Sequence, residues 1–106
     1  MSISARYRTL SADARLLQKK ITTSSPELQD QVERELAKAT ETLVAFAEQV
    51  GEIPQFKLEK ELTPVLIKAH GELDRARLLL EAADDEVNAE RIWDMEQLIY
   101  RLLNDL

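Results

Sequence analysis

The chain has 106 residues, of which 44% are apolar, so its composition excludes disorder and its length favours a single domain around one modest core. It has no cysteine, which excludes disulfides, thiolate metal sites and cysteine nucleophiles and fits an intracellular, cytoplasmic location. The net charge of −6 argues against nucleic acid as a partner, and no apolar run approaches the roughly 20 residues that span a membrane.

The first predicted helix covers residues 4–21. Its apolar residues recur at spacings of four and three, as along one seam of a helical bundle, and they are Ile3, Tyr7, Leu10, Ala14, Leu17 and Ile21. The polar run 22–25 then interrupts the pattern. We therefore expect this helix to contribute one narrow apolar face to the core.

The second predicted helix covers residues 26–50. Ser25 followed by Pro26 is a typical N-cap and first helical position. Gly51 is expected to end the helix in a left-handed turn, and Pro54 blocks its continuation. Residues 51–63 are predicted to form a connector that contains a short helical turn.

The last two predicted helices cover residues 64–83 and 88–105. Pro64 is placed as the first residue of the third helix, and the apolar register slips at Asp84 and Asp85, where acids favour a new N-terminus. The sequence thus predicts an all-α fold, an antiparallel four-helix bundle. Because no Gly or Pro enforces the last break, a three-helix bundle with one long C-terminal helix remains the alternative.

The last helix has more apolar surface than one core needs. Its apolar arc covers roughly 220° of the circumference, whereas a bundle helix buries about half of it. An exposed apolar patch often marks an interaction site. The predicted partner-binding residues are Trp93, Tyr100, Leu98, Ile67 and Leu78, with Glu90 and Asp94 at an acidic rim. Alternatively, Trp93 and Tyr100 cover the core.

The sequence contains no recognisable catalytic, cofactor-binding or metal-binding motif, so we do not expect an enzyme, a cofactor, a metal or a small-molecule substrate. The single histidine, His70, resembles the phosphoryl-accepting residue of histidine phosphotransfer domains, which are also helical bundles. Those domains typically place a Lys-Gly pair soon after the histidine. Here Glu72 and Asp74 follow and would repel a phosphoryl group, so a pairing of His70 with Asp74 is the favoured interpretation.

Three functional hypotheses follow in order of preference. The first is a non-enzymatic protein-interaction module, namely an adaptor, an assembly subunit or a small chaperone-like binder, whose partner is another protein or itself as a homodimer. The second is a small acidic inhibitor or immunity-type protein that neutralises a basic target by charge complementarity. Its binding residues would be Asp84, Asp85, Glu86, Glu90 and Asp94. The most remote is phosphotransfer through His70.

Overall fold

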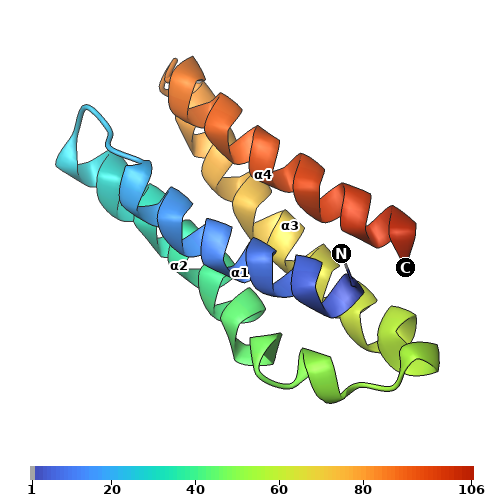
Figure 1. The fold of residues 1–106 in the computed structure, drawn as a ribbon. Coiled ribbons are helices and arrows are strands. Elements are labelled where there is room, and N and C mark those ends of the chain that lie inside the picture. Colours follow the sequence, from blue (N-terminus) through green and yellow to red (C-terminus); the bar gives the residue numbers. More distant parts are fainter. Residues whose placement is uncertain (1) are drawn as a thin grey trace.

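The computed structural model describes residues 2–106, which form four long helices running up and down side by side (Figure 1). Two short 3-10 turns lie between the second and third helices. In chain order the elements are α1 (Ile3–Lys20), α2 (Pro26–Ala47), η1 (Val50–Glu52), η2 (Gln55–Lys57), α3 (Leu58–Ala82) and α4 (Glu86–Asp105). The predicted antiparallel four-helix bundle is confirmed, and the alternative with one long C-terminal helix is wrong because α3 and α4 are separate.

Apolar stripes from all four helices meet in one continuous core. Each stripe repeats at intervals of three and four residues, which keeps its side chains on one face of its helix. Tyr7 of α1 and Leu43 of α2 are both fully buried. The Tyr7 hydroxyl donates a hydrogen bond of 2.7 Å to the Leu43 carbonyl, and burial raises the pKa of Tyr7. The polar end of this ring is therefore satisfied inside the core.

The loop between α1 and α2 is held in place by Gln29. Its amide nitrogen donates a hydrogen bond of 2.9 Å to the Ile21 carbonyl, and its Oε1 accepts one of 2.6 Å from the Thr23 N–H. The predicted N-cap of α2, Ser25, accepts a hydrogen bond of 3.2 Å from the Leu28 N–H. The side chains at the start of α2 therefore fix both the loop and the helix that follows it.

The turn between α3 and α4 explains how the two helices separate without glycine or proline. Asp84 has a φ of 59°, in the left-handed region that ends many helices. The N–H groups of Asp84 and Asp85 donate to the Glu81 and Leu80 carbonyls, which completes a Schellman motif. Asp85 then caps α4 by accepting a hydrogen bond of 3.2 Å from the Asn88 N–H.

Asn88 connects the two turns at this end of the bundle. Its side chain is buried, and its amide nitrogen donates hydrogen bonds of 2.9 Å to the Thr22 carbonyl and 2.8 Å to the Asp85 carboxylate. At the opposite end lie both chain termini and the connector between α2 and α3 (Figure 1). There Arg6 of α1 pairs with Asp105 of α4 at 2.8 Å.

The predicted start of the third helix is wrong. Helix α3 begins at Leu58, so Pro64 lies inside it and leaves one backbone carbonyl of the preceding turn without its helical partner. Leu58 and Leu62 are both buried in the core. Their burial offsets the cost of the proline and continues the helix backwards into the predicted connector.

The predicted end of the second helix is also wrong. Helix α2 ends at Ala47, and Gly51 does not have the expected positive φ but lies within η1. A Cβ atom at Gly51 would lie 2.5 Å from a terminal nitrogen of Arg8, whose guanidinium crosses this turn. The absence of a side chain at Gly51 therefore leaves room for the Arg8 guanidinium. No helix among residues 2–106 combines the length and apolar character needed to cross a membrane.

Candidate functional site

The apolar residues that we predicted to bind a partner lie on the surface of the bundle. Their exposed fractions are 58% for Ile67 and 50% for Leu78 on α3, and 46% for Trp93, 39% for Leu98 and 54% for Tyr100 on α4. The core is filled by other side chains, including the fully buried Ile92 and Ile99 of α4. The alternative in which Trp93 and Tyr100 cover the core therefore does not describe this fold.

Trp93 lines an open groove of about 470 Å³ between the end of α3 and the start of α4, here named the acidic groove. Its lining residues are Arg77, Glu81, Asp84, Glu86, Ala89, Glu90 and Trp93. The Arg77 guanidinium lies over the indole ring, with its Cζ 5.4 Å from the ring centroid, in a cation–π contact. Glu86, Glu90 and Trp93 follow at spacings of four and three, so they share one stripe of α4. The structure thus brings the predicted Glu90 beside the aromatic ring.

Leu98 and Asp94 lie on the other flank of α4, towards α1. With Asp13 and Leu16 of α1, among others, they line a separate hollow of about 180 Å³. Leu16 is 52% exposed and was not among the predicted site residues, although it stands outside the apolar stripe of its helix. The predicted site residues therefore divide between the two flanks of α4 and the outer face of α3.

Arg77 also belongs to a charge cluster at the α3–α4 interface, formed by His70, Asp74 and Arg77 with Glu96 of α4. Glu96 is fully buried, with its Oε2 3.2 Å from Arg77 Nε and its Oε1 3.6 Å from His70 Nε2. The Arg77 N–H groups instead donate to Asp74, at 3.0 and 2.6 Å, and to Glu81, at 2.6 Å. Neither carboxyl oxygen of Glu96 has a hydrogen-bond partner among residues 2–106.

The environment of Glu96 favours its neutral form. Burial, followed by the neighbouring Asp74, raises the pKa of Glu96 to about 8, and Arg77 opposes this rise without cancelling it. Burial is also the largest single influence on Asp74 and acts to raise its pKa, but the hydrogen bond from Arg77, the interaction with Glu96 and the nearby positive charge together outweigh burial, so the pKa of Asp74 is lowered. At neutral pH the cluster thus holds a proton on Glu96, while the ionised Asp74 pairs with Arg77.

His70 does not have the surroundings that we expected. Its ring contacts Glu96 at 3.6 Å, whereas we predicted Asp74 as its partner. A phosphoryl group on His70 would lie one helical turn from the ionised Asp74, and the two anions would repel each other. Among residues 2–106, no three His, Asp or Glu side chains are arranged to hold a metal ion.

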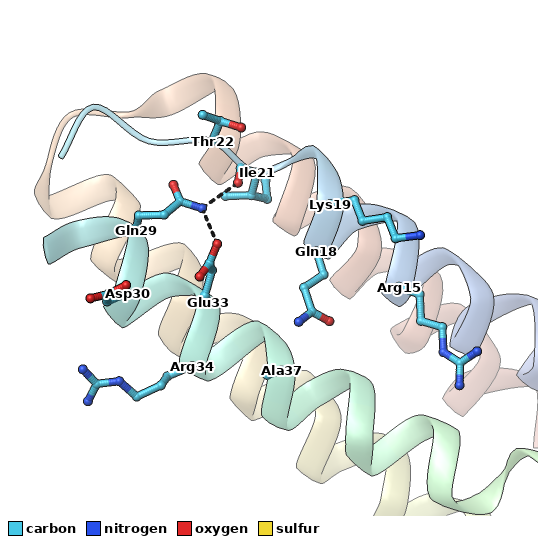
Figure 2. A pocket seen from close by; sticks show the side chains of 10 residues that line it. All are labelled: Arg15, Gln18, Lys19, Ile21, Thr22, Gln29, Asp30, Glu33, Arg34 and Ala37. Atoms are coloured by element: carbon cyan, nitrogen blue, oxygen red, sulfur yellow. Dashed lines mark hydrogen bonds between the residues drawn. The ribbon is translucent and has the colours of Figure 1, made fainter. Parts of the chain in front are cut away.

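A wider hollow of about 890 Å³ lies between the ends of α1 and α2. Figure 2 shows Gln29 at its upper edge, bonded to the Ile21 carbonyl and to Glu33, which are structural contacts of the loop. Lys19 and Arg34 stand on opposite sides of the hollow and point apart (Figure 2). These two cations therefore do not converge on a common point in the hollow.

Comparisons of this chain with protein-family models, with characterised proteins and with solved structures find no match. A four-helix bundle by itself does not determine function, because the same architecture supports many unrelated activities. The surface chemistry of α3 and α4 is therefore the basis for the functional proposal.

Proposed function

We propose that this protein is a non-enzymatic interaction module that binds another protein through exposed side chains of α3 and α4. The exposure of Trp93 and Tyr100 carries this proposal. These residues are seven positions apart, about two helical turns, so they lie on the same flank of α4. Tryptophan and tyrosine are enriched among the residues that dominate binding energy, because they bury a large area with few rotatable bonds. An adaptor, an assembly subunit or a small chaperone-like binder would use such a surface.

The spacing of the exposed residues favours a helical partner. Ile67 and Leu78 are eleven residues apart on α3, about three helical turns, and so share one face. A partner helix laid along α4 would meet Trp93 and, two turns further on, Tyr100. Helix-in-groove recognition typically uses anchor residues at such helical spacings.

Affinity capture with matched variants tests the proposal. The baits are the wild type, Trp93→Glu and Phe56→Glu, since Phe56 is 83% exposed on η2 at the other end of the bundle. We expect one partner to be retained by the wild type and Phe56→Glu and lost by Trp93→Glu, with all three baits folded by circular dichroism. Equal retention of every bound protein by all three baits would refute the proposal.

Sedimentation velocity distinguishes a different protein from a second copy as the partner. A wild-type dimer that Trp93→Glu converts into folded monomer would identify self-association through this flank of α4. A monomer at all concentrations would assign the surface to a different protein. Either result is compatible with an interaction module, whereas a dimer unaffected by Trp93→Glu would place the self-interface elsewhere.

The acidic inhibitor is the second candidate. It is supported by one observation, that Asp84, Glu86 and Glu90 line the same groove. Two of the five acids predicted for this function are differently placed, because Asp85 caps α4 and Asp94 lies towards α1. Binding that weakens steeply with salt and survives Trp93→Glu would favour the inhibitor, whereas binding that Trp93→Glu abolishes would favour an interface with an apolar centre.

A further inference from the structure

The acidic groove carries more negative than positive charge. Its lining includes four carboxylates and a single guanidinium, that of Arg77. Arg77 is already paired with Glu81 within the groove and with the charge cluster beneath it. Across the described residues, no ion pair involves Asp84, Glu86 or Glu90. These three carboxylates are therefore compensated by water and, for Glu86 in the first turn of α4, by the positive end of the helix dipole, but by no positively charged side chain.

A partner that fills the groove beside Trp93 also covers these carboxylates. Glu86 and Glu90 stand two turns and one turn, respectively, before Trp93 on the same stripe of α4. Removing water from an uncompensated carboxylate costs more than an apolar contact alone regains, and a second anion would add repulsion. A purely apolar or acidic occupant is therefore disfavoured, whereas one with lysine or arginine beside its apolar residues restores the lost charge compensation.

The same argument disfavours a symmetric homodimer through this groove. A two-fold interface joins the same patch of each copy, so it would bring the four carboxylates and single guanidinium of both grooves into one buried, strongly negative interface. The net charge of −6 adds repulsion between copies at longer range. The occupant that fits the groove is therefore a different, positively charged protein segment.

We propose that the acidic groove binds a cationic amphipathic helix of a partner protein. Its apolar side chains cover the exposed part of Trp93, while its lysines or arginines pair with Asp84, Glu86 and Glu90. This proposal rests on the proposed function and adds the chemical class of the partner. The stripe from Glu86 to Trp93 covers about two turns, or roughly 10 Å, so three or four turns of partner helix suffice.

The chain provides its own probe of binding, because Trp93 is its only tryptophan. The test ligand is a synthetic amphipathic helix of leucine and lysine, about 18 residues long and free of tryptophan. A leucine–glutamate peptide of the same pattern and a lysine–serine peptide without apolar residues are the controls. We expect saturable binding and a blue shift of Trp93 emission only with the leucine–lysine peptide, and weaker affinity as salt increases.

A matched pair of double variants locates the site. Glu86→Gln with Glu90→Gln removes two groove carboxylates, and Glu48→Gln with Glu52→Gln removes two exposed carboxylates at the other end of the bundle. Both double variants change the net charge equally. We expect the groove variant to weaken peptide binding about tenfold and the control variant to bind within about twofold of wild type.

Three results would overturn the cationic-helix proposal. They are no Trp93 response to the leucine–lysine peptide, an equal response to the leucine–glutamate peptide, and equal losses in the two double variants. None of them would refute the proposed interaction module, which fails only if Trp93→Glu and Phe56→Glu capture the same proteins. Affinity capture therefore tests whether the interaction surface exists, and peptide titration tests the charge of its partner.

Discussion

Glu96 Oε2 lies 3.2 Å from Arg77 Nε, yet the two side chains share no hydrogen bond. The Arg77 N–H groups are directed to Asp74 and Glu81 instead. The Arg77 cation attracts an ionised Glu96, but burial and the neighbouring Asp74 outweigh this attraction and raise the pKa of Glu96. The α3–α4 interface is therefore built around a neutral carboxyl group.

We expect the protein to become less stable as the pH rises from about 5 to about 8. The pKa of Glu96 is raised to about 8 in the folded state, so between the unfolded and folded pKa values the folded chain holds the extra proton. The stabilisation is complete below the unfolded pKa and is lost as the pH rises through the folded pKa. Urea unfolding at several pH values should show a loss of the order of 2–4 kcal/mol.

Glu96→Gln is the control for this pH dependence. The substitution keeps the shape of the side chain and removes its ionisation. The stability of the variant should therefore fall much less between about pH 5 and pH 8, and above pH 8 the variant should be more stable than the wild type. Asp74 acts in the opposite sense, because its lowered pKa stabilises the fold above its unfolded pKa and this contribution is lost in acid. An unchanged profile in Glu96→Gln would show that another group controls the decline.

Tyr7→Phe should destabilise the bundle by about 1 kcal/mol. The substitution removes the hydrogen bond from the buried hydroxyl to the Leu43 carbonyl while keeping the ring that packs in the core. Tyr100→Phe provides the comparison, since Tyr100 is 54% exposed and should change stability by less than about 0.5 kcal/mol. Equal effects of the two substitutions in urea unfolding would contradict this assignment.

Trp93→Ala should leave the fold intact, with a loss of less than about 1 kcal/mol. Nearly half of this side chain is exposed, so its removal leaves no sealed cavity. Leu80→Ala, which truncates a fully buried side chain on α3, should cost about 2–5 kcal/mol. Thermal unfolding of both variants provides the measurement. A large loss of stability for Trp93→Ala would show that this ring contributes to the core.

Asp84→Gly should stabilise the protein by about 0.5–1 kcal/mol. Asp84 occupies the left-handed conformation at the end of α3, where a Cβ atom is disfavoured. Asp84→Val should have the opposite effect, because β-branching makes this conformation more costly. If both variants unfold at the wild-type urea concentration, backbone strain at this turn is negligible.

The helical architecture was predictable because its local patterns agree with its packing. The Ser25–Pro26 start of α2 and the register slip at Asp84 gave the boundaries of three helices to within a few residues. The start of α3 was missed because Thr63 and Pro64 have the local chemistry of a helix start. Burial of Leu58 and Leu62 is a tertiary effect that overrides this local preference.

The candidate site was only partly predictable. The exposed Trp93 and Tyr100 follow from the wide apolar arc of the last helix, which also has Leu98 at its opposite edge, but the sequence did not show that the Leu98 edge faces α1. Glu96 was missed although it stands four residues after Ile92 and three before Ile99, on the core stripe itself. An acid at such a position indicates a buried ionisable group. Its partners come from α3, so they depend on how the two helices align.

Asn88 gives the two ends of the bundle different susceptibility to local opening. It links the α1–α2 loop to the start of α4, so backbone amides near these turns should exchange with deuterium more slowly than those of the connector. The acidic groove lies at this linked end, so we expect it to be ordered before a partner arrives. Little ordering entropy would then be lost on docking, which favours slow dissociation.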